Sequence, residues 1–309
     1  MLSVAALLQT GLATASDTTP PDAADRLLVP QAYLAGGFSA PVSMRPGRAP
    51  SGEYIKLIFP SALAANGPDL YVADFGQRML LRIDTVSQAV TRLRELPPLP
   101  GVRLKTATDG SVYVLRPDRG EVERLARDGH RLASFASEFE ILRPSDLVVE
   151  PMLNQIWIAD AAGGVFAFHP SGRMSHPLAG RGDGFGEEFS GATLLAAGRE
   201  RVIGFDPRCR CILEFDREGA TIGSFAHQEL LDPTDLAIDA HDRSWVLDRG
   251  DRTLKVFDGG RFVASIPAAQ LGLSGLTAIA IDVYRAYIAD GPGGRIGIFA
   301  ILPPSRRAP

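Results

Sequence analysis

The sequence predicts an all-β fold, a six-bladed β-propeller with four-stranded antiparallel blades whose ring is closed by an N-terminal strand. The first of three observations behind this prediction is a tetrapeptide that recurs along the chain. Clear copies are YVAD at 71–74, WIAD at 157–160, WVLD at 245–248 and YIAD at 287–290, and weaker copies are YVLR at 113–116 and IGFD at 203–206. Their last positions differ by 42, 44, 46, 42 and 42 residues, which indicates six repeats of nearly constant length.

The second observation is that each repeat has the pattern of four short strands. An apolar segment precedes the tetrapeptide, as at 147–149 and 236–238, and a segment after it ends in an aromatic or aliphatic residue such as Phe215. A glycine turn, as at Gly219, then leads to a fourth segment that ends near Phe225. No stretch keeps a 3.6-residue apolar period long enough for a helical repeat, so we interpret the repeats as blades.

The third observation concerns the two ends of the repeat array. The last repeat stops soon after Phe299, before any fourth strand, whereas residues 31–60 precede the first repeat. We expect the segment near 33–44 to supply the missing outer strand of blade six. Such an overlap closes the ring and removes the exposed blade faces that an open array would leave.

The remaining segments are predicted from composition. Residues 1–15 are apolar, end in Ala-Thr-Ala and are interpreted as a signal peptide, although no Lys or Arg precedes the apolar run; 16–30 is predicted to be a polar linker, 31–302 the propeller and 303–309 a disordered tail. We therefore expect an exported protein, periplasmic or extracellular. No apolar run reaches the roughly 20 residues of a membrane span. The net charge of −4, with Lys and Arg spread along the chain, disfavours nucleic acid as a partner.

Two segments carry a resemblance to a known family. The residues PSDLVV at 144–149 lead to WIAD, and PTDLAI at 233–238 lead to WVLD. This order of proline, polar residue, apolar strand and a tetrapeptide like "VAD" resembles the NHL repeat over roughly residues 60–300, with repeats two and four departing from the pattern. The resemblance implies a six-bladed propeller that serves most often as a binding platform, with enzymes in a minority of its relatives.

Candidate binding residues lie where the repeats differ. The repeated aspartates at 74, 160, 206, 248 and 290 are interpreted as turn-stabilising residues, because a carboxylate at a strand end accepts backbone N–H groups of the following turn. A site is expected instead at the starts of the innermost strands, whose residues should face the central channel. These candidates are Ser61, Arg103, Ser145, Asp146, Gly191, Thr234, Asp235 and Thr277.

Two functions remain open. The first is a non-enzymatic propeller, without a cofactor, that recognises a protein, peptide or envelope component through loops at one end of the disc. The alternative is a Ca²⁺-dependent hydrolase of the lactonase or esterase type that uses Asp146 and Asp235, although Ca²⁺ takes about six to eight oxygen ligands. The resemblance also includes zinc-dependent lyases, but the five histidines fall in turns or outer strands, and no catalytic triad is evident.

The two cysteines, Cys209 and Cys211, are separated by one residue. On an extended backbone they point to the same face, with Cα atoms near the upper limit of about 6.8 Å for a disulfide. A local disulfide and a pair of free thiols both remain open, and two cysteines are too few for a structural zinc site. The glycine-rich segment 180–186, with its Arg-Gly-Asp tripeptide, is assigned no function.

Overall fold

The computed structural model describes residues 27–40, 52–136, 141, 143–161, 164–179 and 192–304. The expected signal peptide, residues 16–26 of the expected linker, residues 305–309 of the expected tail, Gly191 and the segment 180–186 lie outside the described residues. Among the residues that are described, no helix has the length and apolar character to cross a membrane.

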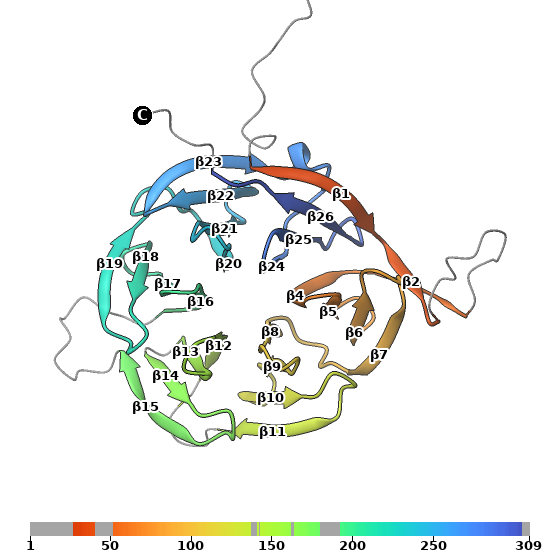
Figure 1. Ribbon diagram of the computed structural model, residues 1–309, viewed down its shortest axis with the longest axis horizontal. Coiled ribbons are helices and arrows are strands. Elements are labelled where there is room, and N and C mark those ends of the chain that lie inside the picture. The colour runs from red at the N-terminus through yellow and green to blue at the C-terminus, as the bar shows by residue number, and fades with distance from the viewer. Residues whose placement is uncertain are drawn as a thin grey trace, which may run out of the picture.

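Six four-stranded antiparallel sheets stand around a central channel, so the predicted six-bladed propeller is confirmed (Figure 1). Blade 1 contains β4 (Pro60–Asn66), β5 (Asp69–Asp74), β6 (Met79–Asp84) and β7 (Val90–Glu95). Blade 2 contains β8 (Arg103–Thr106), β9 (Val112–Arg116), β10 (Glu121–Leu125) and β11 (Arg131–Ala136). Blade 3 contains β12 (Pro144–Glu150), β13 (Gln155–Asp160), β14 (Val165–Phe168) and β15 (Met174–Ala179).

The second half of the ring repeats this arrangement from the innermost strand outward. Blade 4 contains β16 (Leu194–Ala197), β17 (Val202–Asp206), β18 (Cys211–Phe215) and β19 (Thr221–Phe225). Blade 5 contains β20 (Pro233–Ile238), β21 (Ser244–Asp248), β22 (Thr253–Asp258) and β23 (Arg261–Pro267), followed by the short 3₁₀ helix η1 (Ala268–Leu271). Blade 6 contains β24 (Ala278–Asp282), β25 (Arg285–Asp290), β26 (Arg295–Ile301) and β1 (Leu28–Leu34).

The N-terminal strand closes the ring, as expected. Strand β1 pairs antiparallel with β26 from Leu28 opposite Ile301 to Leu34 opposite Ile296, so the first described residues complete the last blade (Figure 1). The strand begins at Leu28, inside the segment expected to be a linker, and ends before most of the segment near 33–44 that we expected to form it. Pro30 sits beside a register irregularity of this outer strand, a position where its missing N–H is tolerated.

The described residues 35–40 and 52–57 lie between the closing strand and blade 1 in the sequence. Strand β2 (Gly36–Phe38) pairs with β3 (Tyr54–Lys56), and the Phe38 N–H donates to the Gln88 carbonyl of blade 1 at 3.2 Å. The N-terminal segment therefore spans blades 6 and 1 and holds together the two ends of the repeat array.

The hydrophobic core lies between blades. Each of six apolar clusters combines buried residues of two adjacent blades, and together they run around the whole ring. The aromatic residues of the repeated tetrapeptide are at most 1% exposed: Tyr71, Tyr113, Trp157, Trp245 and Tyr287. Burial of one such side chain contributes about 2–3 kcal/mol, which explains why the first position of the tetrapeptide is aromatic in five repeats.

Candidate functional site

The channel is bounded by the edges of the six innermost strands. Strands β4, β8, β12, β16, β20 and β24 each end their sheet, so one edge of each has no neighbouring strand within its blade (Figure 1). The backbone N–H and C=O groups on such an edge need partners from side chains or water. This demand determines what most of the candidate residues do.

Four of the candidate residues, together with Thr193, form a ring of half-buried hydroxyl groups at one end of the channel. Each hydroxyl lies 3.1 to 3.5 Å from a carbonyl oxygen of the second strand in its own blade, and the Thr277 hydroxyl lies closer, at 2.8 Å, to the Pro60 carbonyl oxygen of blade 1. In blades 1, 3 and 5 the hydroxyl residue occupies the register irregularity that follows a proline. The ring consists of Ser61, Ser145, Thr193, Thr234 and Thr277.

Thr193 is a ring member that the sequence analysis missed. The blade 4 candidate was Gly191, in a blade that has no proline before its innermost strand. A spacing could have found it, since Thr193 lies 13 residues before Asp206 (206 − 193), just as Ser61 lies 13 residues before Asp74 (74 − 61).

Arg103 reaches across the channel from blade 2. Its Nη1 donates to the Thr234 carbonyl of blade 5 at 3.0 Å, and these two blades lie on opposite sides of the opening (Figure 1). Its Nε atom is buried without a hydrogen-bond partner among the described residues. The guanidinium therefore places a positive charge in the channel next to the hydroxyl ring.

Asp146 and Asp235 link neighbouring blades. Both side chains are buried, and each carboxylate accepts the N–H of its own next residue and one N–H of the following blade. These second donors are Leu195 N, at 2.9 Å from Asp146 Oδ2, and Ile279 N, at 2.9 Å from Asp235 Oδ2. Both aspartates thus satisfy unpaired edges of inner strands.

The environment of Asp235 favours its neutral form. Burial raises the pKa of this carboxyl, the positive charges of Lys105 and Arg103 oppose the rise, and the Asp146 carboxylate adds to it. The two channel cations of blade 2 therefore act electrostatically on a carboxylate of the opposite blade.

The residues present do not fit a calcium site. Asp146 and Asp235 are buried and occupied by backbone N–H donors, whereas Ca²⁺ takes about six to eight oxygens with several converging carboxylates. In the part of the chain that the structure describes, no group of three or more His, Cys, Asp or Glu side chains is arranged to hold a metal ion.

The repeated aspartates at the ends of the second strands have turn-stabilising contacts. Asp74 accepts the N–H groups of Ile58, Phe59 and Gln77, so it holds both the chain entering blade 1 and the turn that follows β5. The equivalent residue in blade 5, Asp248, accepts corresponding N–H groups in its own blade.

An apolar arc, defined as Phe59, Phe75 and Leu99, lies beside the hydroxyl ring on blades 1 and 2. The rings of Phe59 and Phe75 are in edge contact with centroids 6.3 Å apart. Phe75 and Leu99 border one small pocket together with Ser61, and they are 38% and 50% exposed. The arc thus places exposed apolar surface next to the channel entrance that contains Arg103.

The other half of the channel is a cavity of about 150 Å³ that all six innermost strands line. Leu63, Val149, Ile238 and Ile281 are among its lining residues, and Lys105 is the charged residue of the lining. The two ends of the channel therefore differ, with hydroxyl groups at one end and mainly aliphatic residues at the other.

Comparison with known proteins supports the fold. No family model matches the chain, and no curated protein matches it. A gluconolactonase from Xanthomonas campestris has a TM-score of 0.61 at 17% identity, covering 80% of this chain and 87% of that one. A virginiamycin B lyase from Staphylococcus aureus has a TM-score of 0.56 at 12% identity, covering 79% and 95%. The WD40 β-propeller domain of Doa1 has a TM-score of 0.55 at 13% identity, covering 80% of each chain.

These likenesses define the chain as a β-propeller and go no further. Two of these similar proteins are a lyase and a gluconolactonase and the third is a WD40 domain, so the shared fold does not separate catalysis from binding.

Proposed function

We propose that this protein is a non-enzymatic binding propeller of the NHL type that recognises a protein or peptide segment at the end of the disc carrying the hydroxyl ring. The NHL assignment is supported by the two segments at 144–149 and 233–238 and by the observed six-bladed ring. The ligand places an apolar side chain on the apolar arc and a carboxylate, from an acidic residue or a chain terminus, above Arg103.

The observation that carries this proposal is the position of Arg103. A guanidinium presents several N–H donors in a planar fork, and that geometry suits a carboxylate. Arg103 uses one of its nitrogens to hold the opposite blade and stands among hydroxyl groups beside exposed aromatic surface. Carboxylate and apolar contacts side by side are a common basis for peptide recognition.

The proposal requires no metal or cofactor. The hydrolase alternative shares the fold, but the only support it had in the sequence was the pair Asp146 and Asp235, whose oxygens bind backbone N–H groups. We also propose that the protein works outside the cytoplasm. The Cys209–Cys211 disulfide supports this location, since disulfides persist mainly in oxidising compartments.

Selection of displayed random peptides with free carboxyl termini on the full chain tests the proposal. We expect enriched peptides with an apolar residue close to a carboxylate, and capping or amidating that carboxylate should weaken binding by about tenfold or more. Arg103→Gln should abolish this difference, and Phe75→Asp should weaken every selected peptide.

A matched control lies at the opposite end of the disc. Met152 is 60% exposed in the turn between β12 and β13, so Met152→Asp should leave peptide binding unchanged. Peptides that bind equally to the wild type and to Arg103→Gln and Phe75→Asp would refute the site. Stoichiometric calcium, with an unfolding midpoint that falls on chelation, would overturn the proposal in favour of the hydrolase.

A further inference from the structure

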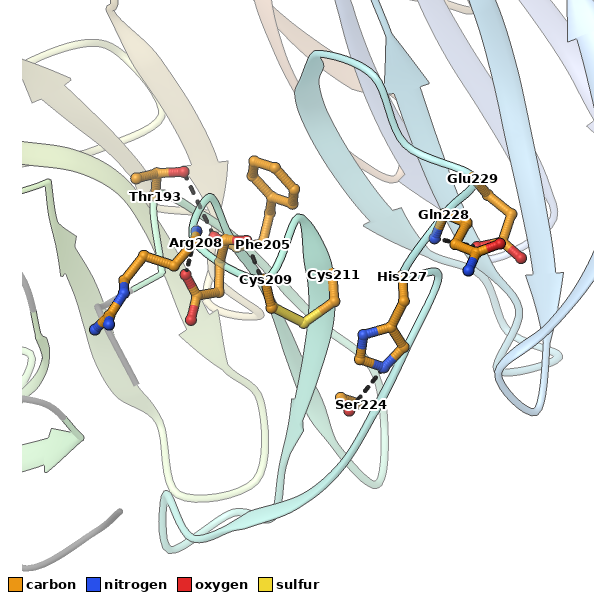
Figure 2. Close-up of a disulfide and its surroundings, with 10 residues drawn as sticks. Thr193, Phe205, Arg208, Cys209, Cys211, Ser224, His227, Gln228 and Glu229 are labelled. Carbon is orange, nitrogen blue, oxygen red and sulfur yellow. Dashed lines mark hydrogen bonds between the residues drawn. A yellow bond between two sulfur atoms is a disulfide. The ribbon is translucent and has the colours of Figure 1, made fainter. Parts of the chain in front are cut away.

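The two cysteines form a disulfide in the turn between β17 and β18 of blade 4 (Figure 2). Their Cα atoms are 5.1 Å apart, closer than on an extended backbone, because Arg210 between them adopts φ 53°. The bond therefore encloses a single intervening residue. These are the only cysteines of the chain.

This disulfide is expected to contribute little to the stability of the fold. A cross-link stabilises a fold mainly by closing a loop in the unfolded chain, and the effect is least for a short loop. The turn is already closed by the strand ladder, in which Asp206 pairs with Cys211 at the start of β18 and Phe205 pairs with Ile212. The fold does not depend on the bond for its closure.

The two sulfur-bearing residues differ in accessibility. Cys209 is exposed in the turn, whereas Cys211 is 1% exposed at the first position of β18. An exposed sulfur can be attacked by an incoming thiolate, and a buried partner sulfur held beside it can leave and later return. Exposure thus selects Cys209 as the attacked residue.

The reduced state also has a partner in place. Cys209 Sγ lies 3.7 Å from the carbonyl oxygen of Asp206, a distance at which a reduced thiol can donate a weak hydrogen bond (Figure 2). The Asp206 carbonyl oxygen therefore offers the Cys209 thiol an acceptor after reduction.

We propose that the Cys209–Cys211 disulfide undergoes thiol–disulfide exchange with a dithiol of a protein or peptide that reaches this end of the disc. A substrate thiolate attacks Cys209 Sγ, the Cys209–Cys211 bond breaks, and Cys211 leaves as a thiolate that takes up a proton. The second substrate thiol, after losing a proton, attacks the mixed disulfide and releases Cys209 in the same way. Two electrons pass from the substrate, which becomes a disulfide, to the pair, which becomes two thiols.

This activity is independent of peptide binding at Arg103. The turn that contains the disulfide follows the second strand of blade 4, as the turn with Phe75 follows the second strand of blade 1, so both lie at the same end of the disc. Peptide binding without exchange, and exchange without peptide binding, are distinct results.

The first test uses the wild-type chain in glutathione redox buffers, with thiols counted by alkylation and mass. Because the chain has two cysteines, every thiol detected belongs to this pair. We expect reduction in the native state, at a rate that does not follow global unfolding in low denaturant, and nearly equal unfolding midpoints for the oxidised and reduced forms. Reduction only at the rate of global unfolding would overturn the proposal.

Single variants test which sulfur is attacked. Cys211→Ser leaves the exposed Cys209 thiol, and Cys209→Ser leaves the buried Cys211 thiol. We expect the Cys211→Ser thiol to form a mixed disulfide with an oxidised test peptide about tenfold faster or more. The double variant should form none. Equal rates for the two single variants would overturn the assignment of Cys209, and native-state reduction of the wild type remains decisive if a variant does not fold.

Discussion

Blades 2 and 5 face each other across the channel, and their polar residues are opposite in charge at the same positions. Asp248 and Lys255 form a buried ion pair in blade 5, with 2.7 Å between Oδ2 and Nζ. In blade 2 the residues at the same two positions, again seven apart, are Arg116 and Glu123, whose Nη1 and Oε2 atoms are 3.9 Å apart. The two blades thus contain ion pairs at equivalent positions, with the acidic and basic residues exchanged.

The inner strands show the same exchange of charge. Asp235 of blade 5 pairs with Leu247, the residue before the last position of its tetrapeptide, and Arg103 of blade 2 pairs with Leu115, which holds the equivalent place. Asp235 accepts backbone N–H groups between blades, whereas Arg103 donates across the channel. Blade 2, one of the two blades whose repeats depart from the pattern, therefore supplies both channel cations, Arg103 and Lys105.

The connection entering each blade explains why blade 2 can lack the aspartate. Asp248 accepts the N–H groups of Leu231 and Asp232, which lie 17 and 16 residues before it. The residues 17 and 16 positions before Arg116 are Leu99 and Pro100, and proline has no N–H to offer. One of the two N–H donors has therefore disappeared together with the acceptor, so the exchange leaves fewer unsatisfied groups than the same change would in blade 5.

The largest expected effect comes from removing the carboxylate in blade 5. Asp248→Ala removes the acceptor of several N–H groups and leaves the Lys255 ammonium with the partly exposed Asp251 carboxylate at 2.8 Å, so we expect a loss of about 3–5 kcal/mol in the free energy of unfolding. Arg116→Ala should cost about 1 kcal/mol, because Glu123 keeps Arg94 at 3.0 Å. Urea unfolding of both variants measures the difference.

A charge-reversed blade 5 sharpens this prediction. The double variant Asp248→Arg with Lys255→Glu restores an ion pair of the blade 2 polarity but offers no acceptor to the N–H groups of Leu231 and Asp232. We expect it to stay nearly as unstable as Asp248→Ala. Recovery of wild-type stability would show that the ion pair, and not the backbone acceptor, accounts for the aspartate.

The sequence predicted the blades because their signals are local. The recurring tetrapeptide, the apolar alternation and the glycine turns each act within one repeat. Even the irregular fourth copy follows packing, since a Cβ at Gly204 would lie 2.7 Å from the Ala192 side chain. The closing strand was located less well, because Pro30 hides the strand pattern of the residues around it.

The roles of the candidate site residues were not predictable in the same way. Arg103 and the Thr234 carbonyl are 131 positions apart and meet only because the ring closes. Ser145 and Asp146 are adjacent in sequence, yet one belongs to the hydroxyl ring and the other links two blades, because a register irregularity separates their directions. Strand register, which composition does not specify, decides which of them reaches the channel.

The stability contributed by Asp235 and by Asp248 should depend on pH in opposite directions. Burial raises the pKa of Asp235 above the ordinary value of 3.8, so its folded state holds the proton more tightly and the stability it contributes is lost as pH rises. Burial alone would raise the pKa of Asp248, but its N–H donors and Lys255 outweigh burial and lower it. The stability that Asp248 contributes is therefore present above the ordinary value and lost as pH falls.

Asp235→Asn and Asp248→Asn should accordingly show opposite trends. The free energy of unfolding of the wild type relative to Asp235→Asn should fall as pH rises above the ordinary aspartate range, and relative to Asp248→Asn it should fall as pH drops below that range. Each unit of pKa difference corresponds to about 1.4 kcal/mol. Parallel trends in urea unfolding across pH would contradict the assignment.

The smallest expected effect tests whether blade 2 acts on blade 5 across the channel. The positive charge of Lys105 lowers the pKa of Asp235, so Lys105→Gln should move that pKa further upward. Carboxyl ¹³C NMR of labelled aspartate, assigned with Asp235→Asn, measures the shift directly. Lys56→Gln, an exposed change in β3, serves as the control and should leave the titration unmoved.

The shift of the Asp235 pKa in Lys105→Gln shows whether the opposite charges of blades 2 and 5 act on each other. If the pKa of Asp235 rises, then the cations of blade 2 and the carboxylate of blade 5 form one electrostatic unit, and a ligand carboxylate on Arg103 should raise that pKa as well. If the pKa stays unchanged, the two blades satisfy their backbone groups separately. Arg103 would then bind a ligand carboxylate without an electrostatic effect on Asp235.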